Sequence, residues 1–359
     1  MSKLAAALSK SQLNGRKPAI LTTLMIMIIV AVVIAALIVI PLWRDSATPA
    51  TIDSANFMTV CEVAEGEPAQ ESNRRIADSA VADLLAGTRS YLGPCAEYGA
   101  SLPLGGGRIT AFSQTGEAGE PLAIGLAADD AVYDALPFEP PTGRLWCHDK
   151  NADGVVADHG ECTGGHETVL PLADAFTARA DIPFTYVLAN WNPHGHVPPG
   201  VWDTAHFDVH FYLNDNAERL AIRPGSCPQL THCDDYRLGK ALPDPKYRHP
   251  DYVDLDAVEP GMGQHLIDST TPELNGGDFT STFIYGSWNG EITFLEPMVA
   301  LSRYEALRNG SQEDSCIDIK QPQAWQQPGW YPTKYCLRHR DNRAETLTTL
   351  EGFVRHSAG

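Results

Sequence analysis

Potential metal ligands gather in one short stretch of this chain. Four of its twelve histidines lie within seventeen residues, and Asp208 lies between the last two of them. The five residues are His194, His196, His206, Asp208 and His210. Neutral imidazole and carboxylate together suit divalent transition metals such as Zn, Fe or Mn. The cluster therefore predicts a metal site, and a hydrogen-bonded histidine network without a metal is the alternative.

The segment 206–212 (HFDVHFY) alternates ligand-type and apolar residues. Side chains of a β-strand point alternately to its two faces. One face would then carry His206, Asp208, His210 and Tyr212. The other face would carry Phe207, Val209, Phe211 and, just beyond, Leu213. The pattern predicts a half-buried strand with a polar inner face.

Strand geometry limits which of these residues can share an ion. Residues i and i+2 lie ~6.7 Å apart along a strand, and residues i and i+4 lie ~13 Å apart. His206 and His210 should therefore not bind the same ion from one regular strand. We expect the pair His194-x-His196 to bind together with one of them, and Asp208 to be a ligand or to orient a ligand.

Two residues further along the chain are candidates for the same site. His265 lies in the segment 262–265 (MGQH), and Glu296 directly precedes Pro297. Proline cannot donate to a strand ladder, so we expect the strand to end there. A carboxylate at that strand end would complete a shell of three histidines and one glutamate. Without such a cluster, either residue would have a structural role.

A calcium loop is a separate candidate. Asp149, Asn151 and Asp153 match positions 1, 3 and 5 of a calcium-binding loop. Position 12 is Gly160, and Glu161 comes one place late. The segment predicts a Ca²⁺ site, with an acidic turn that binds no ion as the alternative.

The elements that must position these residues are mostly strands. Short apolar runs are separated by Gly, Pro and Asn, and they occupy 108–113, 121–126, 168–172, 184–190, 207–213, 279–285 and 291–294. Asn289-Gly290 supplies the positive φ angles of a type I′ hairpin turn. Residues 70–92 show a helical pattern. We predict an α+β fold, predominantly antiparallel β, built as a barrel or a sandwich and preceded by one transmembrane helix.

A membrane anchor is expected at residues 18–43, which carry no charge. About 20 apolar residues span a bilayer core of ~30 Å, whereas the apolar part of a cleaved signal peptide, the alternative here, is shorter. Lys3, Lys10, Arg16 and Lys17 precede the segment, so residues 1–17 should be cytoplasmic. The chain is then a single-pass protein of the cytoplasmic or inner membrane. A linker (44–70) would lead to a β-rich domain (71–359) on the periplasmic or extracellular side.

The cysteines agree with export. All eight follow the apolar segment: Cys61, Cys95, Cys147, Cys162, Cys227, Cys233, Cys316 and Cys336. An even number in an exported region predicts disulfides, and the spacing suggests pairs of consecutive cysteines. Zinc binding is the competing interpretation, but the chain contains no CxxC pair.

The charge excludes one class of partner. The net charge is −19, and from residue 44 onward 22 basic residues face 45 acidic ones. No cationic surplus exists to displace counterions from a phosphate backbone, so nucleic acid is not an expected partner. GxSxG, HExxH and GxGxxG motifs are absent from the sequence, so no particular reaction is indicated.

Several segments resemble a bacterial family of exported proteins. They are 190–196 (NWNPHGH), 206–212, 294–298 (FLEPM), 146–147, 164–167, 262–265 and 331–333. That family is a domain of unknown function related to a protein controlled by an extracytoplasmic-stress sigma factor. The resemblance spans about residues 105–355 and implies a β-rich exported domain able to form homo-oligomers. It implies no reaction or small-molecule ligand. The anchor and an insertion around Cys227–Cys233 depart from the family.

Overall fold

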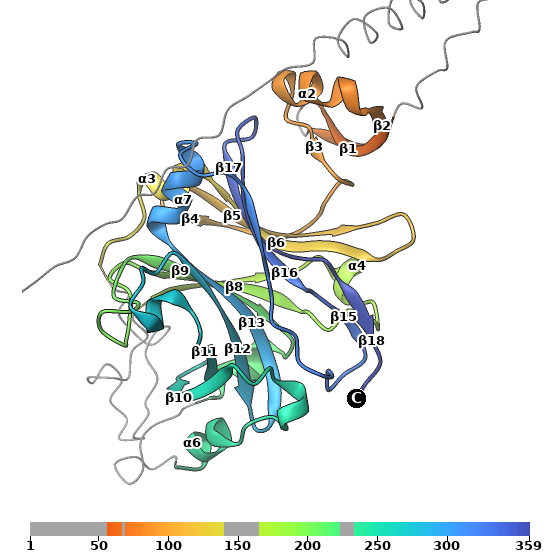
Figure 1. Cartoon of the computed structure of the whole chain (residues 1–359). Helices are drawn as coiled ribbons and strands as arrows, with labels where there is room; N and C mark the ends of the chain where they lie inside the picture. The colour runs from red at the N-terminus through yellow and green to blue at the C-terminus, as the bar shows by residue number, and fades with distance from the viewer. Residues whose placement is uncertain (1–55, 67–68, 140–164, 223–232) are drawn as a thin grey trace, which may run out of the picture. The chain divides into compact units, whose positions relative to one another are not determined.

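Two antiparallel sheets hold most of the strands that the computed structural model describes, in residues 56–66, 69–139, 165–222 and 233–359 (Figure 1). The larger sheet has seven strands in the order β10-β11-β12-β13-β9-β8-β7. Its strands are β7 (His166–Pro171), β8 (Tyr186–Asn192), β9 (His206–Tyr212), β10 (Tyr252–Glu259), β11 (Gly263–Asp268), β12 (Ser281–Trp288) and β13 (Glu291–Ala300). β9 and β13 are thus inner strands, with neighbours on both sides.

The second sheet has six strands in the order β14-β16-β17-β6-β5-β4. Its strands are β4 (Glu97–Leu104), β5 (Gly107–Thr115), β6 (Pro121–Asp129), β14 (Ser315–Asp318), β16 (Lys334–Arg340) and β17 (Glu345–Glu351). A separate pair is formed by β15 (Gly329–Tyr331) and β18 (Val354–His356). Every apolar run expected to be a strand overlaps a strand of the structure.

The main core lies between the two sheets. Val209 and Phe211 of β9 and Leu295 of β13 belong to one cluster with Ile124 of β6 and Leu337 of β16. Burial of such side chains contributes about 1.5–3 kcal/mol each, so this layer dominates the stability of the fold. The prediction of a predominantly antiparallel β fold is confirmed, in sandwich-like form.

The other face of the seven-stranded sheet is also covered. Tyr212 and Leu188 on this face belong to a second apolar cluster, together with Trp202 and Met262 from the loops. The polar side chains of β9 lie on this covered face and not between the sheets. The prediction that His206, Asp208, His210 and Tyr212 share one face is therefore confirmed, but the strand is buried on both faces and not half-buried.

The β12–β13 hairpin confirms one turn and corrects one strand end. Asn289 and Gly290 have φ angles of 49° and 83°, as a type I′ turn requires. The strand after the turn does not end at Glu296, because β13 continues through Pro297 to Ala300. Between β13 and β9 the paired residues on either side of Glu296 and Pro297 keep one register. The missing N–H of Pro297 interrupts the ladder without ending it.

A small N-terminal sheet replaces part of the expected linker and helix. Its order is β2-β1-β3, with β1 at Phe57–Ala64, β2 at Gln70–Ala77 and β3 at Tyr91–Leu92. Residues 57–64 were expected in a linker and residues 70–77 in a helix. They pair with each other along their whole length, and only α2 (Asp78–Gly87) is helical. Long-range pairing of two strands overrides the local helical pattern.

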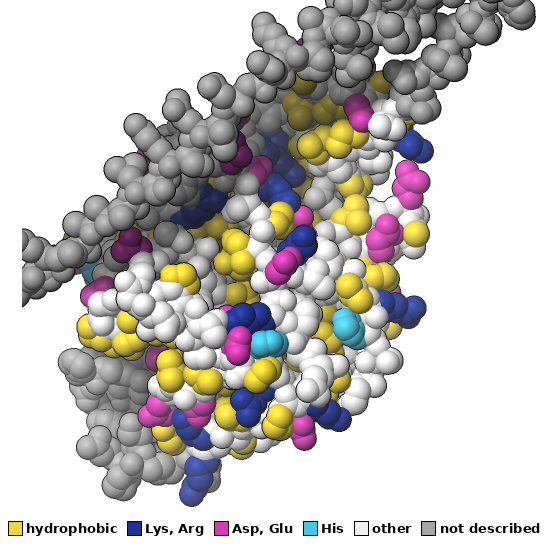
Figure 2. All heavy atoms as spheres, viewed as in Figure 1, with side chains coloured by type: hydrophobic (Ala, Val, Ile, Leu, Met, Phe, Trp, Pro, Cys, Tyr) yellow, Lys and Arg dark blue, Asp and Glu magenta, His cyan; other side chains and the backbone are white. Residues whose placement is uncertain are grey.

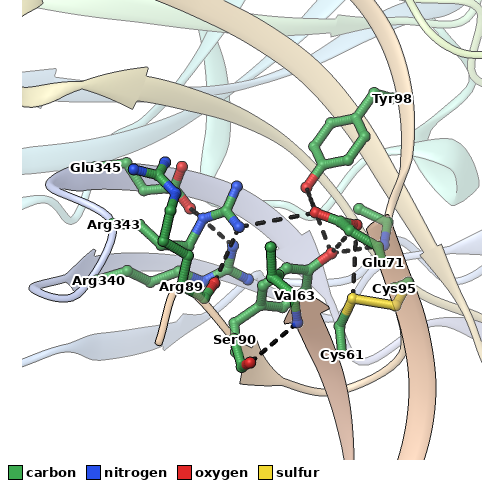
Figure 3. A network of polar contacts seen from close by, with 12 residues as sticks. Cys61, Val63, Glu71, Arg89, Ser90, Cys95, Tyr98, Arg340, Arg343 and Glu345 are labelled. Atoms are coloured by element: carbon green, nitrogen blue, oxygen red, sulfur yellow. Dashed lines mark hydrogen bonds and ion pairs between the residues drawn. A yellow bond between two sulfur atoms is a disulfide. The ribbon is translucent and has the colours of Figure 1, made fainter. Parts of the chain in front are cut away.

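Polar contacts fasten this small sheet to β16 and β17 (Figure 3). Tyr91 and Tyr98 each donate to Glu71 at 3.0 Å. The guanidinium groups of Arg340 and Arg343 lie 4.2 and 5.0 Å from the centre of the Tyr91 ring. Such cation–π contacts contribute about 0.5–2 kcal/mol each, so the network positions the small sheet.

The remaining helices are short. They are α3 (Asp130–Asp134), α4 (Asp174–Thr177), α5 (Asn216–Leu220), α6 (Cys233–Lys240), α7 (Leu301–Arg308), η1 (Pro245–Tyr247) and η2 (Pro272–Asn275). Among the described residues no helix has the length and apolarity to cross a bilayer. The expected anchor at 18–43 lies outside those residues.

On the face seen in Figure 2, basic side chains lie among acidic ones.

Candidate metal centre

A first triad is formed by His196, His206 and Asp208. His206 and Asp208 come from β9, and His196 comes from the loop between β8 and β9. The Nε2 atom of His206 lies 3.1 Å from Oδ1 of Asp208, and Nε2 of His196 lies 3.4 Å from Oδ2. One ligand atom from each residue falls within 4.8 Å of the others. Ligands of a tetrahedral Zn²⁺ lie about 3.3 Å apart, given bonds of about 2.0–2.1 Å.

Backbone carbonyls fix both imidazoles of this triad. Nδ1 of His206 lies 2.6 Å from the Thr204 carbonyl oxygen, and Nδ1 of His196 lies 2.9 Å from that of Val197. A carbonyl only accepts, so each Nδ1 carries a hydrogen, and each ring in its neutral form would direct the lone pair of Nε2 at Asp208. Metal-binding histidines are held in this way. Two acceptors at such distances need a cation or a proton between them.

The charge state of the triad without a metal follows from its burial. Burial favours neutral groups, but the Asp208 carboxylate outweighs this effect and raises the pKa of His196 to about 9. Burial also disfavours the Asp208 carboxylate, yet His206 and His196 hold the pKa of Asp208 well below its usual range. Nδ2 of Asn192 donates to Oδ2 of Asp208 at 2.7 Å. The carboxylate therefore stays ionised and oriented.

A second triad is formed by His210, His265 and Glu296. These residues come from three strands, β9, β11 and β13. Nε2 of His210 lies 3.5 Å from Oε1 of Glu296, and Nε2 of His265 lies 3.9 Å from Oε2. Burial lowers the pKa of His210 to about 3 and raises the pKa of Glu296 well above its usual range. Burial therefore favours the neutral forms of His210 and Glu296 in the absence of a cation.

The grouping differs from the expected one in two respects. His194 joins neither triad: its side chain is exposed and its ring lies 4.5 Å from that of Phe138. It precedes Gly195, whose φ of 66° belongs to a turn, so His194 and His196 do not share a strand face. The second difference is that Glu296 and His265 do not complete the shell of His196. The ligand-type residues form two groups where one shell was expected.

Other predicted sites are tested only in part. The disulfides Cys61–Cys95 and Cys316–Cys336 are present, and both join consecutive cysteines. Two further disulfides were expected, Cys147–Cys162 and Cys227–Cys233. Neither can be tested, because Cys147, Cys162 and Cys227 lie outside the described residues. The calcium-loop candidates also lie outside them: Asp149, Asn151, Asp153 and Glu161. These expectations stay predictions.

One contributing residue escaped prediction. Asn192 orients Asp208, and its place follows from the β8–β9 register, in which Asn192 lies opposite His206. The same register sets Tyr186 opposite Tyr212. A hairpin pairing assumed between 186–192 and 206–212 would have brought Asn192 to the polar face. The missing signal was therefore strand pairing and not residue type.

Comparison of the chain with protein-family models, curated proteins and solved structures gives no match. The site is therefore interpreted from its own geometry. Two imidazoles and one carboxylate form each triad, a composition that suits Zn²⁺ or non-haem Fe²⁺. Three protein ligands leave at least one coordination position for water or another small ligand.

Proposed function

We propose that this chain is an exported, membrane-anchored protein that binds a divalent transition metal through the first triad. The observation that carries the proposal is the direction of the imidazoles of His196 and His206. Both are held at Nδ1 by backbone carbonyls, and both aim Nε2 at Asp208. Nε2 of His206 and Oδ1 of Asp208 are buried 3.1 Å from each other, and neither has a hydrogen bond to any other group. A bound cation satisfies these atoms.

The composition of the triad favours an open metal site over a structural one. Structural Zn²⁺ sites have four protein ligands, whereas catalytic sites have three and a water. The side chain of His196 is 33% exposed, so solvent reaches this side of the triad. A metal held here would lower the pKa of bound water or bind a small ligand. The substrate is not indicated by the chain.

A metal-free histidine network is the second candidate function. The distances of 3.1 and 3.4 Å also fit ion pairs between Asp208 and protonated imidazoles. The pKa of His196, raised to about 9 chiefly by Asp208 against the effect of burial, favours a charged ring at neutral pH. In that case the triad is a packed polar cluster of an envelope-stress binding or assembly protein.

Metal analysis of the purified full-length protein separates the two candidates. We expect at least one equivalent of Zn²⁺, Fe²⁺ or Mn²⁺ per chain, measured by inductively coupled plasma mass spectrometry. His196→Ala should weaken binding at least about 10- to 100-fold. His194→Ala is the matched control, because His194 lies two residues away and outside the triad. Equal metal content in both variants, or none in the wild type, would refute the proposal.

An open coordination position is tested on the same protein after loading with Co²⁺. Azide added to the Co²⁺ form should change the visible spectrum, because it replaces a water ligand. An unchanged spectrum would mean that the ion is fully enclosed by protein ligands, which contradicts the proposed open site. His194→Ala should behave as the wild type.

The cell-envelope location is proposed from sequence and disulfides together. Residues 18–43 have the length of a membrane span, and the disulfides Cys61–Cys95 and Cys316–Cys336 suit an oxidising compartment. The resemblance to the stress-related exported family supports the same location. We expect protease added to spheroplasts to digest the domain after residue 44. The mass of the purified chain shows whether the anchor is retained; loss of residues 1–43 would refute anchoring.

A further inference from the structure

The second triad lies on the same sheet face as the first, but it is a separate cluster. Asp208 and His210 are two residues apart on β9, which places them about 6.7 Å from each other. Glu296 lies opposite His210, since the β13–β9 register is the same on both sides of this pair. Met298 lies opposite Asp208. The two carboxylates are thus in different rows of the sheet, each with its own pair of imidazoles.

The second triad contains buried polar atoms without partners. His210 and Glu296 have side chains that are 1% exposed. Both ring nitrogens of His210 and Oε2 of Glu296 lack hydrogen-bond partners. Nδ1 of His265 lies 3.2 Å from the carbonyl oxygens of Ala257 and Gly263, which turns Nε2 toward Glu296. Unpartnered buried groups of this kind are costly, and a cation between the three side chains would satisfy them.

Aromatic side chains close this triad from solvent. The ring of Phe294 lies 4.9 Å from that of His210 and 5.1 Å from that of His265. Gly286 of β12 makes room for the Phe294 ring, because a Cβ atom there would overlap it. Tyr212 stacks on His210 at 5.8 Å and lies 5.0 Å from the Phe294 ring. This apolar wall covers the second triad, whereas the first triad is open to solvent at His196.

We infer that the second triad is a second metal position, closed where the first is open. It would take a divalent transition metal such as Zn²⁺ through two imidazoles and one carboxylate. The open position exchanges its ion readily, whereas release from the closed position requires local opening of the sheet face. The inference extends the proposed function and stands on different residues. An experiment can therefore refute either metal position without refuting the other.

Isosteric variants test the two positions in the full-length protein loaded with Zn²⁺ and dialysed. Asp208→Asn removes the first carboxylate and Glu296→Gln removes the second, with little change of shape. Glu273→Gln is the matched control, because Glu273 is a buried glutamate outside both triads whose Oε1 also lacks a partner. We expect two equivalents in the wild type and in the control, and one equivalent in each triad variant.

Release of Zn²⁺ to excess chelator, followed with a chromophoric indicator, gives the second readout. The wild type should release its ions in two phases, the slower at least about 10-fold slower because it needs local opening. Asp208→Asn should abolish the fast phase and Glu296→Gln the slow phase. A single equivalent lost only in Asp208→Asn would overturn this inference and leave the proposed function intact. A single equivalent lost only in Glu296→Gln would overturn the proposed function instead.

A second variant tests the closed position without changing a ligand residue. Gly286→Ala keeps every ligand but adds a Cβ atom that overlaps the Phe294 ring, so this ring must move beside the imidazoles. We expect loss of the slow phase with the fast phase retained. Two unchanged phases in this variant and in Glu296→Gln would refute the closed position.

Discussion

Asp208 is the residue on which the first triad depends. It meets one imidazole at each carboxylate oxygen, and it is 5% exposed. Its orientation is set by Asn192, which lies on the neighbouring strand. Partners of this kind fix the direction of a ligand and so contribute to metal affinity without touching the ion.

Replacement of Asn192 tests that role. We expect Asn192→Ala to lower Zn²⁺ affinity about 10- to 100-fold, because Asp208 loses the donor that orients it. Competition with a chromophoric chelator measures the change. Asn275→Ala is the control, since the Asn275 amide donates to the carbonyls of Ser269 and Thr271 and contacts neither triad. Equal affinities in both variants would show that Asn192 has no orienting role.

Lys320 gives a prediction on pH dependence away from the triads. Its Nζ atom lies 2.7 Å from carboxylate oxygens of both Asp251 and Asp268. Burial disfavours the Asp268 carboxylate, but Lys320 outweighs it and holds the pKa of Asp268 below its usual range. The stabilisation is therefore present above the ordinary pKa of Asp, about 3.9, and is lost as the pH falls through the lower folded value.

We expect Lys320→Met to lower the free energy of unfolding by about 1 kcal/mol at neutral pH, since the pair is partly exposed. The difference from the wild type should shrink toward pH 2, as followed by urea unfolding across the pH range. Lys334→Met is the control, because Lys334 and its partner Asp318 are both largely exposed. A penalty for Lys320→Met that is constant down to pH 2 would contradict the ion-pair explanation.

At the scale of elements, the small sheet depends on one disulfide. Cys61 of β1 bonds to Cys95, 34 residues later, just before β4. Closing a loop of that length stabilises the folded state by about 3–4 kcal/mol, chiefly through the entropy of the unfolded chain. The polar network around Tyr91 adds to this link.

Replacing both Cys61 and Cys95 by Ser should therefore lower the free energy of unfolding by about 3–4 kcal/mol. Hydrogen exchange should become faster in β1–β3 and stay slow in β9 and β13. The double Ser variant of Cys316 and Cys336 is the control, since that disulfide joins β14 to β16. Equal protection of β1–β3 in both variants would show that the Cys61–Cys95 bond does not hold the small sheet.

Sequence patterns predicted a strand or a turn correctly where the pattern itself specifies the local backbone geometry. The alternation in 206–212 and the turn at Asn289-Gly290 both specify local backbone geometry, and both were confirmed. The helical pattern over 70–92 is confirmed only at α2 (Asp78–Gly87), because residues 70–77 pair with β1. The ligand types were readable, but their grouping depends on which strands pair. The Asn289-Gly290 turn pairs β12 with β13, but no local pattern shows that β11 lies beside β12 or that β9 lies beside β13.

At the scale of the whole domain, the main core and the two triads occupy opposite faces of one sheet. The core between the sheets contains Leu295 at 0% exposure. Leu295→Ala should lower the free energy of unfolding by about 2–5 kcal/mol, measured in guanidinium chloride. Leu255→Ala should change it by about 0.5 kcal/mol or less, because Leu255 is 52% exposed. Similar effects of the two substitutions would contradict the assigned core.

Metal removal should act on the same domain. An ion that binds only the folded state at 100 times its Kd stabilises it by about 2.7 kcal/mol. We expect a chelator to lower the Tm of the wild type and of His194→Ala. The Tm of a variant that lacks both Asp208 and Glu296 carboxylates should not respond. A chelator effect of unchanged size in that variant would place the bound metal elsewhere.

The hairpin loop that carries His196 also has a consequence for how such a protein can change. The other ligands stand on strands whose opposite sides build the core, so altering them disturbs the sandwich. His196 alone comes from a loop, and its neighbours from Val197 to Gly200 are exposed. The length and sequence of this loop can therefore change, in evolution or by design, while the strands stay the same. Metal preference at the open position would then drift through loop exchange, with the closed position inherited unchanged.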